Sequence, residues 1–221
     1  LYSNTSGGNN SAIGSNALYS NTTGSDNLAL GYAALYANTT GYNNNAIGYA
    51  ALSANTTGKD NLALGFQSLY KNTEGDNNNA MGYQALYANT TGANNTGIGY
   101  QALYDNTTAS YNSAFGYQAL RSNTTGVRNI ALGYQSLYTN TTGGNNTGIG
   151  YYALYNNTES SENVAIGHQA LYTNTGFTLG RNVAVGTEAL YSNTSGVYNN
   201  AFGYQSMYNN TTGYYNSAFG P

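Results

Sequence analysis

One seventeen-residue unit repeats along the whole chain. Thirteen apolar residues start the copies, and each start lies one full unit after the previous one, with a single exception. The exception is the copy between Leu171 and Leu190, which is longer than the others by two residues. A period this short is typical of a solenoid coil and is too short for a propeller blade or a two-helix repeat. The starting residues are Leu1, Leu18, Leu35, Leu52, Leu69, Leu86, Leu103, Leu120, Leu137, Leu154, Leu171, Leu190 and Met207.

The unit has invariant landmarks. Written once, it reads Leu-Tyr-x-Asn-Thr-Thr-Gly-x-x-Asn-x-Ala-(Ile/Leu/Phe)-Gly-Tyr-Gln-Ala, numbered here as positions 1 to 17. Asn at positions 4 and 10, Thr at position 5 and Gly at position 14 occur in all thirteen copies. When coils stack, each position contacts its own counterpart above and below, so a residue that fits once fits every time. The sequence therefore predicts an all-β fold, an elongated β-solenoid (β-roll or β-helix) of thirteen coils, with intertwined and trimeric arrangements left open.

Two columns of apolar side chains are expected inside the coils. A short strand would turn the large residue of position 13, such as Ile13, Leu30 or Phe115, inward. The Leu of position 1 would form the second column. Small residues at positions 12 and 14 suit a place where another backbone approaches closely, either the opposite wall of the coil or a second chain. A single helical turn from position 15 onward, for instance Tyr100 to Tyr104, is an alternative for that segment.

Composition favours one repeat domain over an ordinary globule. Only 6% of the residues are charged and 29 are Gly, and Gly, Asn and Thr are poor or indifferent helix formers. We interpret 1–221 as a single repeat domain and as a fragment of a longer chain, because its first residues already belong to a repeat and its last repeat is incomplete. The two extra residues of the long copy lie near 176–181. This arc has the Asn, Thr and Gly of an exposed turn, where insertions are tolerated.

The Asn of position 4 has two interpretations. Followed by Thr-Thr or Thr-Ser it is an N-glycosylation acceptor, but Asn72, Asn157 and Asn174 keep Asn-Thr without the second hydroxyl. A turn or a ladder of stacked amides explains more copies. The possible glycosylation sites are Asn4, Asn21, Asn38, Asn55, Asn89, Asn106, Asn123, Asn140, Asn193 and Asn210.

The Asn of position 10 is expected to form a stacking ladder of its own. It stands two residues before a small residue in every copy, so the same amide would recur at each level of the stack. Its members are Asn10, Asn27, Asn44, Asn61, Asn78, Asn95, Asn112, Asn129, Asn146, Asn163, Asn182, Asn199 and Asn216.

Tyr and Thr also recur in rows. Stacked Tyr columns are expected to pack between chains, with their hydroxyls reaching water or a partner, and a sugar-stacking surface is the alternative. Ice-binding solenoids space their Thr so that two point outward from one strand. Here the two Thr are adjacent, so in a strand they would face opposite ways, which argues against ice binding.

The remaining residue types favour neither catalysis nor nucleic-acid binding. The five basic residues form no run, so a phosphate backbone would not be neutralised. No Cys is present, no apolar run approaches a membrane span, and no carboxylate recurs in every copy as in calcium-binding repeats. His168, the only histidine, fills a slot that usually holds Tyr, and of the acidic residues only Glu159 and Glu162 are close in sequence. We expect no catalytic residue, no metal site, no cofactor, no nucleic-acid partner and no membrane span.

Two phrases of the repeat resemble known repeat proteins. Asn-x-Ala-Ile-Gly, as at 44–48 and 163–167, resembles the head repeats of trimeric autotransporter adhesins. Gly-Tyr-Gln-Ala-Leu-Tyr-x-Asn-Thr-Thr-Gly, as at 82–92, is similar to repeats of bacterial and phage tail-fibre-like proteins. The resemblance implies a homotrimeric extracellular β-roll or β-helix fibre used for attachment.

The expected function is structural. We predict an extracellular, cell-surface or virion fibre, with glycosylation left open, that self-associates and serves in adhesion. A solenoid that presents Tyr, Asn and Thr rows to surface glycans or to ice is the first alternative, and an enzyme dependent on His168 or Glu162 is the second.

Overall fold

The computed structural model describes residues 1–176 and 179–220, and in them the chain is an all-β solenoid, as the repeat predicts. Each repeat makes one coil, and the described residues contain no helix. The chain forms two compact units, Leu1–Ser110 and Tyr111–Pro221.

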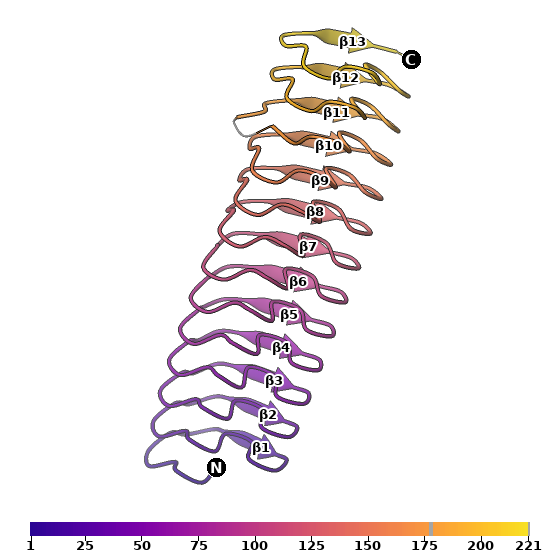
Figure 1. Ribbon diagram of the computed structural model, residues 1–221. Helices are drawn as coiled ribbons and strands as arrows, with labels where there is room; N and C mark the ends of the chain where they lie inside the picture. Colours follow the sequence, from indigo (N-terminus) through magenta and orange to yellow (C-terminus); the bar gives the residue numbers. More distant parts are fainter. Residues whose placement is uncertain (177–178, 221) are drawn as a thin grey trace. The chain divides into compact units, whose positions relative to one another are not determined.

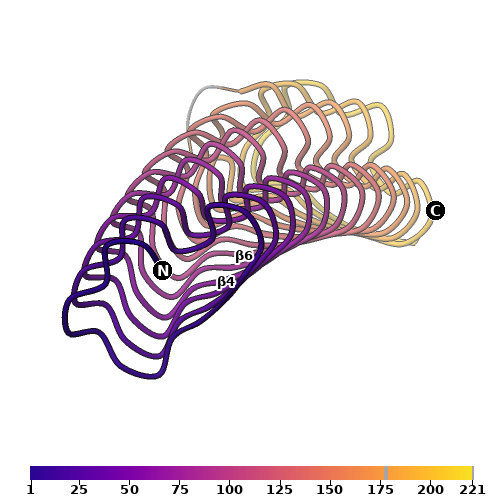
Figure 2. The ribbon, with the colours of Figure 1, turned by 90° about the horizontal axis from the view of Figure 1, so that it is seen from below.

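The first unit contains six parallel strands that pair in chain order (Figure 1). Each strand is three residues long and occupies positions 11 to 13, so Ala12 lies opposite Ala29, its equivalent in the next repeat. Seen from below in Figure 2, the coils of this unit repeat one outline, with β4 and β6 on the same side. The strands are β1 (Ser11–Ile13), β2 (Leu28–Leu30), β3 (Asn45–Ile47), β4 (Leu62–Leu64), β5 (Asn79–Met81) and β6 (Thr96–Ile98).

The second unit follows the same rule with seven strands. The long copy keeps the strand register, because Val164 pairs with Val183 in spite of the two extra residues between them. The strands are β7 (Ser113–Phe115), β8 (Ile130–Leu132), β9 (Thr147–Ile149), β10 (Val164–Ile166), β11 (Val183–Val185), β12 (Asn200–Phe202) and β13 (Ser217–Phe219).

Backbone hydrogen bonds between coils extend well beyond the strands. At position 1 the Leu52 N–H donates to Ser68 O at 2.9 Å, and at position 5 the Thr56 N–H donates to Thr73 O at 2.9 Å. The turns of one coil are therefore satisfied by the turns of the next, which explains how so small a coil with a single short strand holds a fixed shape.

The core consists of the position-1 Leu with the small residues of positions 12 and 17, and the prediction that position 13 points inward is wrong. Leu52 and Ala63 are fully buried, whereas Leu30 is 40% and Ile13 65% exposed. Alternation along a strand puts positions 11 and 13 on the face opposite position 12. The inward slot has little depth: a Cβ on Gly97 would lie 3.4 Å from the Leu86 Cγ of its own coil. The strand faces the opposite wall of the same coil, so Ala fits inside and the larger residue points outward.

The coil turns its corners with left-handed backbone. Positions 1, 9 and 16 have positive φ, as at Leu103 (54°), Asp60 (57°) and Gln101 (52°). The helical turn considered for Tyr100 to Tyr104 is therefore wrong, because a right-handed turn needs negative φ throughout. Non-glycine residues in this region cost about 1 kcal/mol or more each, and complete burial of the Leu side chain offsets that cost.

Position 14 requires glycine for two reasons. Gly48 has φ of 137°, and a Cβ there would lie 2.4 Å from Gly65 O in the next coil. The close approach anticipated at this small residue is thus made by the next coil of the same chain.

Candidate functional site

The position-4 Asn side chains form a ladder along each unit. Asn55 is fully buried; its Nδ2 donates to Asn38 Oδ1 at 2.8 Å and to the Gly58 carbonyl of its own turn at 2.9 Å. Its Oδ1 accepts from Asn72 Nδ2 at 2.9 Å. Each amide therefore closes its own turn and joins two neighbouring coils.

The position-10 Asn side chains form a second ladder, at the positions predicted for stacking. Asn44 Oδ1 accepts from the Asn61 backbone N–H at 3.1 Å and from Asn61 Nδ2 at 3.1 Å. Asn44 Nδ2 donates to the Gly58 carbonyl of the next coil at 2.8 Å. Gly58 O thus accepts from both ladders, since Asn55 also donates to it. The shared position-7 carbonyl was not anticipated from the sequence, although the fixed spacing of Asn, Gly and Asn could have suggested it.

The first ladder leaves no room for glycans at its buried members. Both N–H groups of the amide nitrogen already donate hydrogen bonds, and a glycan on Nδ2 would replace one of them. The glycan would also need space beside a side chain that has no access to solvent. Asn4 is exposed and Asn210 half-buried. The geometry argues against glycosylation of the folded coil at Asn21, Asn38, Asn55, Asn89, Asn106, Asn123, Asn140 and Asn193, which are all fully buried.

Both ladders continue past the two-residue insertion. Asn193 Nδ2 donates to Asn174 Oδ1 at 3.2 Å, and Asn182 Nδ2 donates to Asn163 Oδ1 at 3.2 Å, so each ladder spans the longer copy. Of the insertion region, Phe177 and Thr178 lie outside the described residues, while Leu179 beside them is exposed.

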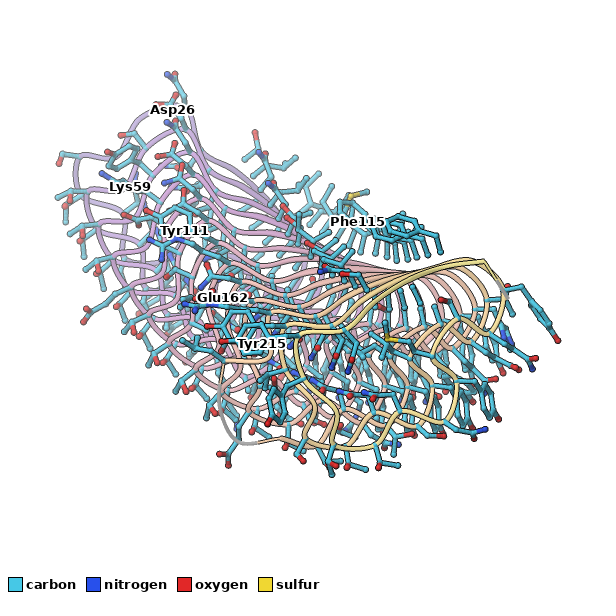
Figure 3. All side chains as sticks on the ribbon, turned by 90° about the horizontal axis from the view of Figure 1, so that it is seen from above. Asp26, Lys59, Tyr111, Phe115, Glu162 and Tyr215 are labelled. Carbon is cyan, nitrogen blue, oxygen red and sulfur yellow. The ribbon has the colours of Figure 1, made fainter. Side chains whose placement is uncertain are left out.

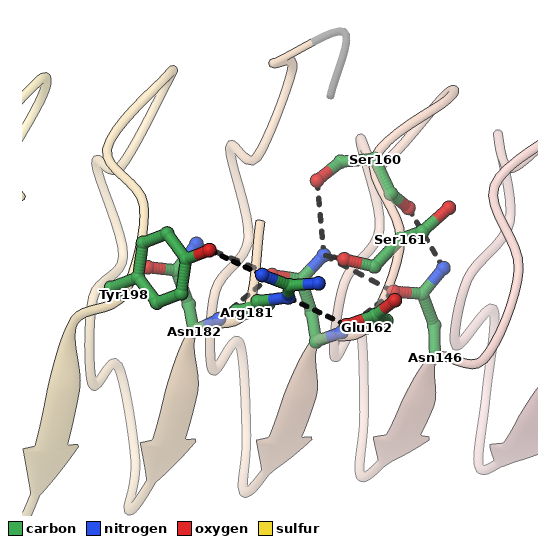
Figure 4. A network of polar contacts seen from close by, with 8 residues as sticks. Asn146, Ser160, Ser161, Glu162, Arg181, Asn182 and Tyr198 are labelled. Carbon is green, nitrogen blue, oxygen red and sulfur yellow. Dashed lines mark hydrogen bonds and ion pairs between the residues drawn. The ribbon is translucent and has the colours of Figure 1, made fainter. Parts of the chain in front are cut away.

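Next to the insertion a serine satisfies the ladder amide in a different way (Figure 4). Asn163 Nδ2 donates to Ser160 Oγ at 3.0 Å, and Ser160 occupies a position 7 that is Gly in most copies. On the surface nearby, Arg181 Nε donates to Glu162 Oε2 at 2.7 Å and Arg181 Nη1 donates to the Tyr198 hydroxyl. The hydrogen bond with Glu162 raises the pKa of Arg181 most, and the hydrogen bond with Tyr198 raises it further.

The position-15 rings, here called the sheet-side rings, stack along each unit. In the first unit they are Tyr32, Tyr49, Phe66, Tyr83 and Tyr100, with centroids 5.1 to 5.2 Å apart and planes within 14° of parallel. Both faces of every inner ring are therefore covered by neighbouring rings, leaving edges and hydroxyls exposed. A sugar that stacks on an aromatic ring needs a free face, so this arrangement does not favour the glycan-stacking alternative.

The position-2 rings form a second stack, beside the Leu column. In the second unit Tyr138, Tyr155, Tyr172, Tyr191 and Tyr208 follow one another at 5.0 to 5.4 Å. Burial raises the pKa of Tyr155 and of Tyr191.

Tyr152 links the two stacks. It fills a position 16 that usually holds Gln, and it lies edge-on to Tyr134 of one stack and to Tyr155 of the other. A hydrogen bond with Tyr151, with a smaller effect of burial, raises the pKa of Tyr152 to about 12.

All five basic residues lie over tyrosine rings. Lys59, Lys71, Arg121, Arg128 and Arg181 are 5.2 to 6.0 Å from the centroids of Tyr42, Tyr87, Tyr138, Tyr111 and Tyr198 respectively. Each cation is thus accommodated by a ring of a neighbouring coil, a contact worth about 0.5–1 kcal/mol at an exposed site.

His168 and Glu162, the two residues of the enzyme alternative, each contact side chains of neighbouring coils. His168 stacks on Tyr151 at 5.3 Å as one more sheet-side ring, and Glu162 pairs with Arg181. Among the described residues no group of three His, Asp or Glu side chains gathers as a metal site would. No helix able to cross a membrane occurs in 1–176 or 179–220.

The two Thr of the turn have different roles. Thr22 Oγ1 donates to Thr39 O of the next coil at 3.0 Å, while Thr23 is exposed. Only one of the two is thus fully exposed in this coil, which does not favour the two-Thr array of the ice-binding alternative.

Most of the exposed large apolar side chains that the structure describes lie on the outward side of the strands, here called the sheet face: positions 11 and 13 with the sheet-side rings. In the second unit ten of its large side chains are at least 36% exposed. The sequence interpretation missed this face because it placed position 13 inside.

Comparisons of the chain with protein-family models, curated proteins and solved structures gave no match.

Proposed function

We propose that this chain is a structural segment of an extracellular fibre or filament, on a cell surface or a virion, and that it serves in surface attachment. The observation that carries the proposal is the direction of the interactions. Within each unit, backbone hydrogen bonds and both Asn ladders run from coil to coil, and rings stack along the same direction wherever successive copies both hold one. Such a design transmits load along the stack and repeats one surface many times.

Composition and resemblance support the same proposal. With no Cys, the chain needs no redox chemistry to hold its fold outside the cell. The repeat phrases resemble those of autotransporter adhesin heads and of tail-fibre-like proteins, and both kinds serve in attachment.

Deleting one coil tests whether attachment is a property of the repeated surface. Removal of 52–68 joins position 17 of one copy to position 1 of another, so the ladders re-form with one rung fewer. Beads that bear the chain should be held under flow on at least one of a glass, an alkyl-coated or a carbohydrate-coated surface, and beads with the deleted chain should be held nearly as well.

The control removes 60–68, which leaves part of one coil that cannot complete either ladder, so this chain should unfold at a lower urea concentration than the chain without 52–68. Retention no better than that of bare beads on all three surfaces would contradict the proposal. Loss of retention on deletion of the intact coil would contradict it too, since that result would indicate one local site.

A further inference from the structure

The sheet face is free of charge, although the chain has thirteen charged residues. All five basic and all eight acidic residues lie at other positions of the repeat, so positions 11, 13 and 15 hold none in any copy, and His168 is their one titratable imidazole. In Figure 3 Phe115 of the sheet face projects from one side of the second unit, and Glu162 lies on another side with Tyr111 and Tyr215. One side of the coil is therefore uncharged and rich in exposed apolar groups.

The exposed area of this face is that of an interface. An aromatic side chain presents about 150–250 Å², so ten large side chains at roughly 40% exposure leave on the order of 800 Å² uncovered in the second unit. A monomer's largest apolar patch is typically about 300–600 Å², and each partner of a standard complex buries about 800 Å². The ten side chains are Phe115, Tyr117, Ile130, Leu132, Tyr134, Tyr151, Ile166, Phe202, Tyr204 and Phe219.

We propose that the sheet face is where two copies of this chain pack against each other. A second copy fits for two reasons. Its own sheet face has no charge to repel or to leave unpaired in a dry contact. Its rows also recur at the spacing of paired strands, about 4.8 Å, so side chains that interdigitate at one coil do so at each following coil, as in paired sheets. This inference rests on the proposed structural role, and it adds that the partner of the fibre segment is a second copy of the same chain.

Sedimentation equilibrium of the full chain at several concentrations tests the proposal. Leu132→Lys with Ile149→Lys puts two charges on the sheet face in neighbouring coils. The matched control, Thr125→Lys with Thr142→Lys, puts the same two charges at exposed position 6 of the same coils. Wild type and control should dimerise alike, and the sheet-face variant should dimerise at least tenfold more weakly.

A labelled chain covers the case in which the sheet-face variant does not fold. Because the chain has no Cys, Leu132→Cys or Thr125→Cys accepts one polarity-sensitive fluorophore. With rising concentration the label at 132 should enter an apolar environment, whereas the label at 125 should not change. A wild-type chain that stays monomeric, or association that both lysine pairs leave unchanged, would overturn the proposal.

A wild-type monomer that binds phosphatidylcholine vesicles through residue 132 would overturn it as well, because the occupant would then be lipid. None of these results bears on the coil-deletion experiment. The proposed function can therefore survive the failure of this inference.

Discussion

At the scale of single residues, buried asparagine joins successive coils beside the buried leucine column. The Asn55 amide makes three side-chain hydrogen bonds that reach both neighbouring coils. Burying a polar group is favourable only when its partners are present, so the ladder depends on its own repetition. This explains why Asn is retained where the glycosylation motif around it is lost, as at Asn72 and Asn157.

Asn55→Ala should be strongly destabilising. It leaves Asn38 Oδ1 and Asn72 Nδ2 each short of a partner in a buried place, and each unsatisfied group costs about 1–3 kcal/mol. Urea unfolding should report a loss of about 2 kcal/mol or more. Thr57→Ala, at an exposed position of the same coil, should stay within about 0.5 kcal/mol of wild type. Equal effects of the two substitutions would be incompatible with the ladder.

At the scale of the coil, the sequence predicts the period, the fold class and the Leu column, and it misassigns the second column. Ordinary strand reasoning places the larger apolar residue inside, which would bury Leu64 rather than Ala63. The structure reverses them, because the opposite wall leaves space for little more than a Cβ at position 12. That depth depends on how the whole coil closes through its left-handed corners, and no local pattern specifies the closure. The invariably small residue at position 12 was the signal for the correct assignment.

The strand of one coil offers a direct test of this reversal. Ala63→Leu should overpack the shallow interior and cost about 1–3 kcal/mol. Leu64→Ala, at a half-exposed outward position, should cost about 1 kcal/mol or less, because only part of a Leu side chain loses its burial. Urea unfolding of both variants gives the order of the two effects. The opposite order would restore the original assignment of Leu64 to the core.

At the scale of the whole molecule, the tyrosine stacks predict a limit in alkali. The folded state raises the pKa of Tyr152 to about 12 from an ordinary value near 10. The stabilisation linked to this phenol is therefore fully present below about pH 10 and is lost as pH rises toward about 12, because the unfolded chain releases the proton first. Urea midpoints should fall across this window. The fall should be smaller in Tyr152→Gln, which restores the common residue of position 16. An identical fall in both proteins would show that Tyr152 does not contribute.

The same scale contains the central claim, that equivalent positions lie directly over one another in successive coils. The absence of Cys permits a clean measurement by disulfide formation, which requires Cα atoms about 4.4–6.8 Å apart. Thr40 and Thr57 are both exposed and occupy the same position in successive repeats, whereas Thr40 and Tyr49 are closer in sequence but about half a coil apart. Under mild oxidation the account predicts an intramolecular disulfide in Thr40→Cys with Thr57→Cys and none in Thr40→Cys with Tyr49→Cys. A bond in the second pair and not in the first would contradict it.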